Sequence, residues 1–223
     1  DAVLAQSMLL DLRLMDKYVA LSRASGSLLQ DIVNGGQSGM VESLLLRRFQ
    51  ERGRVVPPKP DADISEERYE ENEELKGGAV LVPEKGLVED VVILDYKSLY
   101  PTIMMAHNLC YSTVLNRPDL PEHAAGAQDS QIITAPSGGR FVSSAVSPGI
   151  MPAVLRELLE QRTATKRLMK KAGDEEHSFL DAKQYAMKIL LNSFYGYSGY
   201  ARARLYSLAL ANAVTSFGRE NIL

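Results

Sequence analysis

Residues 91–101 read VVILDYKSLYP, and this stretch combines the two kinds of secondary structure on which the fold depends. The four apolar residues before Asp95 predict a short, fully buried β-strand that ends at this carboxylate. From Tyr100 to Leu109 the pattern becomes helical, and Pro101 stands in the first turn, where proline is tolerated. A strand that leads directly into a helix favours an α+β fold.

On the N-terminal side, the sequence predicts two helices and then a pair of strands. Apolar residues at three- and four-residue steps indicate helices over 2–21 and 40–52, separated by the polar stretch NGGQSG at 34–39. Residues 77–94 have a strand–turn–strand pattern, with the turn at 83–86. We therefore expect helical segments before a small sheet.

On the C-terminal side, residues 116–149 are rich in Pro, Gly, Ser and Ala and predict a loop with one short strand near 140–142. Two long helices are expected after it, at about 151–172 and 178–195, joined by AGDEEH. Short loops between long helices favour antiparallel neighbours. The predicted fold class is α+β with a two-helix antiparallel unit.

Composition and charge exclude some classes of protein. The chain has 223 residues, of which 45% are hydrophobic, and its single cysteine rules out an internal disulfide. No apolar run approaches the roughly 20 residues that cross a bilayer, and the first residues lack the charged start of a signal peptide. A soluble, intracellular protein is expected.

The formal net charge of −3 alone argues weakly against nucleic acid as a partner. The charge is unevenly placed, however, because residues 61–74 hold eight acidic residues and one arginine, whereas residues 156–171 hold six basic residues and two glutamates. A local basic face matters more for phosphate contact than the sum over the chain. The alternative for either run is a solvated surface.

Asp95 is the first candidate functional residue. A carboxylate at the end of a buried strand is held rigidly at an exposed edge, where it can bind a hard cation. Phosphoryl transfer with two divalent ions needs such carboxylates. The alternative is that Asp95 only caps the helix that follows.

Cationic side chains on the two long helices form a second candidate site. Arg162 and Lys166 are four residues apart and share one face, and Lys188, Asn192 and Tyr195 form another stripe at steps of four and three. An antiparallel pair can turn both faces to one anion, and a triphosphate with about four negative charges fits this arrangement. Ordinary solvated charge is the alternative for the first two residues. This alternative is weaker for Lys188, because Lys188 interrupts an otherwise apolar helix.

The segment NSFYGYSGYARAR, at 192–204, is a third candidate. Its glycines permit the close approach of a base pair, its tyrosines offer stacking surfaces, and its arginines can meet phosphates. The alternative is a helix end followed by a tight turn in a core. The residues concerned are Tyr195, Gly196, Tyr197, Gly199, Tyr200, Arg202 and Arg204.

Together these segments resemble family B DNA polymerases. DYKSLYPTI, from Asp95, resembles the first signature motif, usually written DxxSLYPSI, and KILLNSFYG, from Lys188, matches the second, KxxxNSxYG. The resemblance extends over residues 77–206, through GGAVLVPEKGL, HNLCYST, LLEQRTATKRLMKK and YGYSGYARARLY. It is closest to archaeal replicative enzymes, and MMAHNLCYST also resembles the eukaryotic delta-type subunit.

The resemblance implies roles for individual residues. Asp95 corresponds to a metal-binding carboxylate of the palm, with the Tyr96 carbonyl as a further ligand. Ser98 and Leu99 match the turn whose amides hold the triphosphate, and Tyr100 matches the gate that collides with a ribose 2′-hydroxyl.

On the two long helices, the resemblance makes Arg162, Lys166 and Lys188 the cations that grip the incoming nucleotide, with Asn192 and Tyr195 beside it. Asp95 and Lys188 are then the expected catalytic residues. The expected DNA contacts are Gly196, Tyr197, Gly199, Arg202 and Arg204.

The N-terminal stretch DAVLAQSMLLDLRLM resembles the segment after the third motif of the proofreading exonuclease, with Asp1 as its metal-binding aspartate. The alternative for Asp1 is a helix cap. The implied architecture is a partial right hand. Its expected parts are the end of a 3′-5′ exonuclease domain (1–13), a helical connection (14–60), the first part of the palm (61–150), the fingers (151–200) and a return to the palm (201–223).

Two residues depart from the family pattern, Leu75 and Thr102, and Thr102 keeps the hydroxyl of the usual serine. The usual Tyr-x-Gly-Gly before the palm is Leu75-Lys76-Gly77-Gly78 here, which puts in doubt how the primer end is shared between synthesis and editing. No YxDTDS-like motif is present, so the second palm aspartate is missing, as are the first two exonuclease motifs and a thumb. We expect this chain to be an internal fragment that is inactive alone.

In the complete enzyme the resemblance implies template-directed transfer of a nucleotidyl group from a dNTP to a primer 3′-hydroxyl, with two Mg²⁺ ions and release of pyrophosphate. The expected partners are primer–template DNA, dNTP and the remainder of the polymerase chain, with no membrane. The expected location is the cytoplasm of a prokaryote or the nucleus of a eukaryote. A non-catalytic, polymerase-derived nucleic-acid-binding or scaffold protein is the alternative, and Tyr100 disfavours an RNA-synthesising relative.

Overall fold

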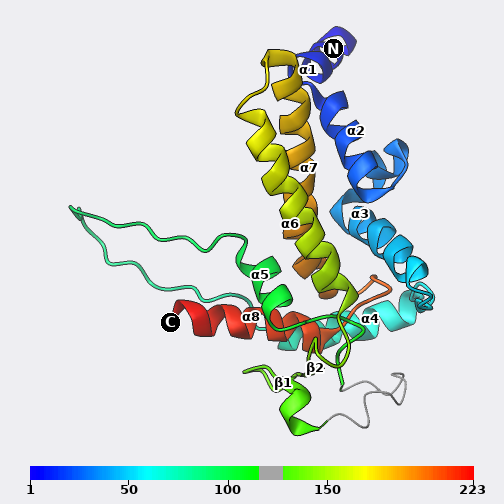
Figure 1. Cartoon of the computed structure of the whole chain (residues 1–223), viewed down its shortest axis with the longest axis vertical. Coiled ribbons are helices and arrows are strands. Elements are labelled where there is room, and N and C mark those ends of the chain that lie inside the picture. Colours follow the sequence, from blue (N-terminus) through cyan, green and yellow to red (C-terminus); the bar gives the residue numbers. More distant parts are fainter. Residues whose placement is uncertain (116–127) are drawn as a thin grey trace.

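The computed structural model describes residues 1–115 and 128–223 and is mostly helical (Figure 1). Part of the predicted loop at 116–149 therefore lies outside the described residues. Among the described residues, short 3₁₀ turns occur at Asn72–Glu74 and Asp129–Gln131. The helices are α1 (Ala2–Asp11), α2 (Leu14–Ser25), α3 (Leu29–Glu51), α4 (Ala62–Glu71), α5 (Leu99–Ala106), α6 (Ile150–Met169), α7 (Asp174–Ser198) and α8 (Leu208–Ile222), and the strands are β1 (Ile132–Thr134) and β2 (Arg140–Val142).

The long helices α6 and α7 pack along each other, which confirms the predicted two-helix unit (Figure 1). Each helix buries an apolar stripe, such as Leu155 and Leu158 on α6 and Leu190 and Leu191 on α7. Three acidic residues occupy the first turn of α7, where they complement the helix dipole. Because both stripes continue over several turns, packing rather than intrinsic propensity stabilises the pair.

The helices α2 and α3 pack against α7 and differ from the prediction. The expected helix over 2–21 is broken at Arg13, whose φ of 47° is left-handed, and the Arg13 guanidinium donates a hydrogen bond to Ser178 of α7. The expected interruption at NGGQSG is found at Gly36, whose φ of 66° and ψ of −167° are not helical, so two helical pieces meet at a break within α3. The buried Ile32 and Met40 lie on either side of this break.

The predicted strands over 77–94 are wrong. Within the described residues this segment pairs with no other strand, and Figure 1 shows it as an extended arm that projects from the helices. Ile93 is 87% exposed and Leu94 is 91% exposed. The apolar pattern requires a partner strand to become a buried sheet, and none of the described residues supplies one. The expected palm sheet is therefore not formed here.

The only sheet in the described part of the chain is the antiparallel pair β1–β2, which includes the strand expected near 140–142. Buried Asn108, after α5, connects this sheet to α6. Its amide donates to the carbonyls of Val142 (2.8 Å) and Ser147 (2.9 Å), and its oxygen accepts from the Gly149 amide (2.8 Å). These bonds fix the start of α6 relative to α5.

The helix α8 lies under α5 and closes the base of the α6–α7 pair. The ring of His107, after α5, stacks on Phe217 of α8 with centroids 3.8 Å apart. Burial lowers the pKa of His107 below its usual value, and nearby Glu220 opposes this shift. No helix among the described residues is long and apolar enough to cross a membrane.

Candidate nucleotide-binding site

Polar residues form a continuous stripe along the α6–α7 pair. The Arg162 Nε donates to Gln184 Oε1 (3.2 Å), so the cation of α6 lies directly against α7. Gln184, Lys188 and Asn192 follow one another at four-residue steps on α7, and Lys188 and Asn192 are exposed. The structure thus brings Arg162 to within about one helical turn of Lys188.

Lys166 extends the same stripe by one turn of α6 beyond Arg162, and it is exposed to solvent. Within the described residues neither Lys166 nor Lys188 forms an ion pair. Unpaired cations on one face produce a positive potential that attracts phosphate groups. The nucleotide stripe, as we call Arg162, Lys166, Gln184, Lys188 and Asn192, is therefore available to an anion.

The lower end of the nucleotide stripe meets α5 at a pair of tyrosines. Tyr195 follows Asn192 by three residues, and its ring centroid lies 4.6 Å from that of Tyr100, with the ring planes inclined by 47°. Burial raises the pKa of Tyr195, with Tyr100 acting in the same direction and Arg219 against it. The two rings form a half-buried aromatic platform beside the cations.

The N-terminus of α5 lies at this platform. Ser98 precedes the helix with a left-handed φ of 56°, and its side chain makes no capping hydrogen bond. The first N–H groups of a helix, here those of Leu99 and Tyr100, have no acceptor within the helix. Together with the helix dipole they can bind phosphate oxygens.

Two glycines confine the Tyr100 ring. A methyl group added at Gly78 would lie 3.1 Å from the Tyr100 hydroxyl, and one added at Gly218 would lie 3.3 Å from its ring. Gly78 belongs to Leu75-Lys76-Gly77-Gly78, the segment that departs from the family pattern. The ring therefore has little space on these two sides.

Three residues of α8 hold this segment, and sequence reasoning missed all of them. Asn212 accepts from the Lys76 amide (3.2 Å), Thr215 donates to the Lys76 carbonyl (2.8 Å), and Arg219 donates to the carbonyls of Lys76 (3.0 Å) and Gly77. Their spacing of three and four residues places them on one face of α8. The sequence alone shows this spacing and so indicates a polar face on the helix, but it does not indicate which backbone atoms the three side chains bind.

Asp95 lies on the exposed arm, three residues before Ser98. Tyr96 follows it, and its phenol donates to the Asn221 carbonyl of α8 (2.8 Å), which anchors the end of the arm. In the described part of the chain, no group of three or more His, Cys, Asp and Glu side chains is arranged to hold a metal ion. Asp95 and the Tyr96 carbonyl are suitable oxygen donors for Mg²⁺, but a two-metal site needs further carboxylates.

The segment expected to contact DNA divides into buried and exposed parts. Tyr197 is 1% exposed, and its hydroxyl donates to Glu42 (3.0 Å). Burial and the negative charge of Glu42 raise the pKa of Tyr197. Arg204 lies 3.4 Å from the same carboxylate and also bonds the Pro57 carbonyl. Both residues thus support the core, in agreement with the alternative interpretation of this segment.

Gly196 and Arg202 are exposed, so both are accessible to a ligand. Gly199 is different, because a methyl group added there would contact Ala211 and Leu75 at 3.5 and 3.7 Å. Asp1 precedes α1, but its side chain makes no capping hydrogen bond. The capping alternative for Asp1 is therefore not supported.

Comparisons with known proteins agree with the sequence resemblance. The model of the family "DNA polymerase family B" matches residues 28–223. DNA polymerase 1 of Pyrococcus abyssi is 41% identical over 203 residues, which are 91% of this chain and 25% of that protein. The DNA polymerase delta catalytic subunit of Candida albicans is 38% identical over 221 residues, which are 96% of this chain and 20% of that protein.

A solved structure of the family B DNA polymerase from the hyperthermophilic archaeon Pyrobaculum calidifontis matches with a TM-score of 0.74 and 35% identity, covering 96% of this chain and 26% of that one. The chain therefore spans about a quarter of the length of such relatives. The family match covers well over half of the chain and includes both signature motifs. This chain belongs to DNA polymerase family B.

Proposed function

We propose that this chain is the nucleotide-binding part of a DNA-dependent DNA polymerase. The observation that supports it most directly is the nucleotide stripe that ends at the Tyr100–Tyr195 platform and at the N-terminus of α5. Cations, free helix amides and an aromatic surface within one site suit a triphosphate joined to a sugar and a base. The family relationship supports the same reading.

In the proposed reaction a primer 3′-hydroxyl attacks the α-phosphorus of a dNTP, and pyrophosphate leaves. Arg162, Lys166 and Lys188 would bind the phosphates and balance the charge that develops on the leaving pyrophosphate. The first amides of α5 would bind the same group from the opposite side. Tyr100 would lie under the sugar and exclude a 2′-hydroxyl, and base pairing to the template would select the nucleotide.

Asp95 and the Tyr96 carbonyl would hold Mg²⁺ together with carboxylates from the remainder of the polymerase chain. When bound, two such ions neutralise charge on the phosphorus oxygens and lower the pKa of the attacking hydroxyl. We assign the proposed fingers to α6–α7 and the proposed first part of the palm to the arm, α5 and the β1–β2 pair. The arm would gain its missing strand partners from that remainder of the chain.

The exposed residues Gly196 and Arg202 are the proposed contacts to primer–template DNA. Asp1 is proposed as one metal ligand of a 3′-5′ exonuclease in the full-length protein. We do not extend the DNA-binding role to Tyr197 and Arg204, which are engaged by Glu42 and Pro57.

The test is single-nucleotide incorporation by the full-length polymerase that contains this segment. Lys188→Ala removes one phosphate-binding cation, so we expect the KM for dNTP to rise by at least about tenfold. Lys170→Ala, at the exposed end of α6, is the matched control and should leave the KM unchanged. An unchanged KM in Lys188→Ala would refute the phosphate role, and a parent protein that binds DNA without extending a primer would support the non-catalytic alternative.

A further inference from the structure

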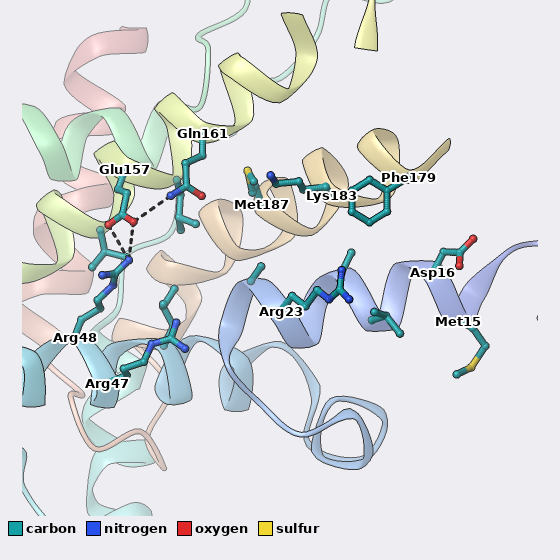
Figure 2. Close-up of a pocket in the computed structure, with 16 residues that line it drawn as sticks. Met15, Asp16, Arg23, Arg47, Arg48, Glu157, Gln161, Phe179, Lys183 and Met187 are labelled. Carbon is teal, nitrogen blue, oxygen red and sulfur yellow. Dashed lines mark hydrogen bonds and ion pairs between the residues drawn. The ribbon is translucent and has the colours of Figure 1, made fainter. Parts of the chain in front are cut away.

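A cavity of about 610 Å³ lies between α2 and α3 on one side and α6 and α7 on the other (Figure 2). This volume is within the range of roughly 300–1,000 Å³ that is typical of small-molecule sites. On α7 it is lined by Lys183 and Met187, each one residue before Gln184 and Lys188 of the nucleotide stripe. One residue is about 100° of helical rotation, so the cavity opens on a different face from the stripe.

The walls of the cavity are largely apolar. Leu44 from α3, Val154 and Leu158 from α6 and Met187 from α7 are all less than 10% exposed. Phe179, which is 53% exposed, stands farther along α7 at the rim. A small, strongly hydrated ion would lose its hydration shell against such walls, whereas an apolar ring would gain contacts.

The charged lining is predominantly positive. Four cationic and two acidic side chains face the cavity: Arg23, Arg47, Arg48 and Lys183 against Asp16 and Glu157. In the described part of the chain, Arg23, Arg47 and Lys183 form no ion pair. Figure 2 shows Arg23 on α2 and Lys183 on α7, so cations stand on both walls of the cavity.

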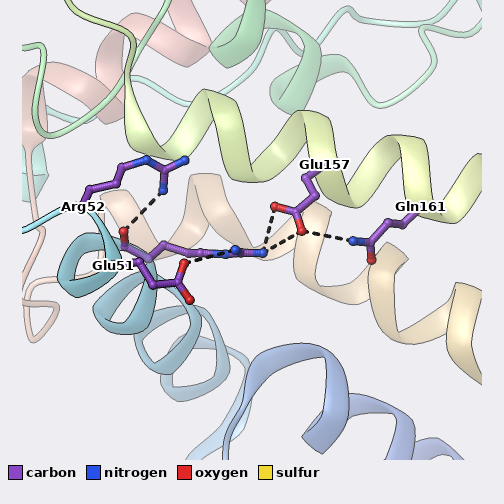
Figure 3. A network of polar contacts seen from close by, with 5 residues as sticks. Glu51, Arg52, Glu157 and Gln161 are labelled. Carbon is purple, nitrogen blue, oxygen red and sulfur yellow. Dashed lines mark hydrogen bonds and ion pairs between the residues drawn. The ribbon is translucent and has the colours of Figure 1, made fainter.

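Arg48 neutralises Glu157 and still has a free donor. Its two terminal nitrogens bind Glu51 (3.2 Å) and both oxygens of Glu157 (2.7 and 2.8 Å), and Gln161 donates to the same carboxylate (Figure 3). Its Nε is buried and has no acceptor among the described residues. Arg48 is therefore engaged by Glu51 and Glu157, and the cations that remain available to a ligand are the other three.

We propose that this cavity binds a small organic anion, namely an aromatic ring that carries one carboxylate, sulfonate or phosphate group. The anionic group would lie among Arg23, Arg47 and Lys183, and the ring would pack on Leu158 and Met187. The apolar walls and the unpaired cations independently favour this class over a neutral or cationic ligand. The inference does not depend on the proposed polymerase activity.

The test uses the full-length polymerase without DNA or nucleotide, titrated with 8-anilinonaphthalene-1-sulfonate while its fluorescence is recorded. We expect one saturable site in this cavity, and both Arg23→Ala and Lys183→Ala should weaken that binding by about tenfold, because each removes a charge-assisted contact. Leu158→Trp should weaken binding, because the larger side chain occupies the part of the cavity in which the ring would pack. Arg156→Ala, an exposed cation of α6 outside the cavity, is the matched control and should bind as the parent does.

Equal affinity of the parent, Arg23→Ala and Lys183→Ala would overturn the proposal. Leu158→Trp can fail to fold, so Phe179→Ala at the exposed rim provides a second apolar variant, for which we expect about threefold weaker binding. Inorganic sulfate is the final comparison. Sulfate that displaces the probe with equal affinity would show that the ring contributes nothing, which would also overturn the proposal.

Discussion

At the scale of single residues, Asn108 determines how two distant segments meet. Its side chain donates two hydrogen bonds and accepts one, all to backbone atoms of residues 142–149. Asn108→Ala leaves two carbonyls and one amide without partners in a buried region, so we expect the free energy of unfolding to fall by about 3 kcal/mol. Urea denaturation measures this change.

The control for Asn108 is Asn221→Ala, which removes an exposed amide from the end of α8 and should have little effect on stability. A loss below about 0.5 kcal/mol in Asn108→Ala would show that water replaces the three bonds. The sequence contained Asn108 within the quoted segment HNLCYST, but its buried role depends on residues more than thirty positions away, which no local pattern predicts.

His107 gives the molecule a pH dependence whose sign follows from its lowered pKa. Burial against Phe217 disfavours the imidazolium in the folded state, so the unfolded state binds a proton at higher pH. Stability should therefore fall as the pH drops below the ordinary histidine pKa of 6.5. His107→Phe keeps a ring on Phe217 and should reduce this loss between about pH 7 and about pH 5.

The measurement for His107 is the urea midpoint as a function of pH. Exposed His177→Gln serves as the control and should retain the pH dependence of the parent. An identical pH dependence in His107→Phe and in the parent would mean that other groups cause the acid loss of stability.

At the scale of elements, α8 acts as a support for the segment 75–78. Thr215→Val keeps the volume of the side chain but removes its hydrogen bond to the Lys76 carbonyl, so local opening of this segment should become more frequent. We expect trypsin to cleave after Lys76 about fivefold faster in this variant, because proteolysis of a locally opened segment follows the population of the open form. Cleavage after Lys85, on the exposed arm, is the internal control and should not change. Equal rates of cleavage after Lys76 in the variant and the parent would show that Asn212 and Arg219 are enough to hold this segment closed.

Elements with local signals were predicted from the sequence, and elements with distant partners were not. The long α6–α7 pair and α5 were predicted because their apolar periodicity is continuous. The strands at 77–94 failed because a strand becomes stable only beside another strand. The two adjacent glycines at 35–36 also gave a local signal, because they predicted a break and the backbone of α3 is non-helical at Gly36.

The candidate site shows the same division between local and distant signals. The stripe of Arg162, Lys188 and Asn192 follows from helical spacing and could be predicted, and so could its end at Tyr195. The contact between Tyr195 and Tyr100 could not, since 95 positions separate them. The close approach of Gly78 and Gly218 to the Tyr100 ring could not be predicted either, because only the fold brings these glycines to the ring.

At the scale of the whole molecule, the arm at 77–97 has a consequence for behaviour in solution. Between residues 78 and 96 it presents extended backbone whose N–H and C=O groups form no hydrogen bond with other described residues, and Val92, Ile93 and Leu94 are 80%, 87% and 91% exposed. Such a segment is a template for edge-to-edge pairing between copies of the chain. The separate 223-residue chain should therefore aggregate as its concentration rises in sedimentation experiments, with Ile93→Lys remaining monodisperse. Thr102→Lys, at an exposed position of α5, should aggregate as the parent does.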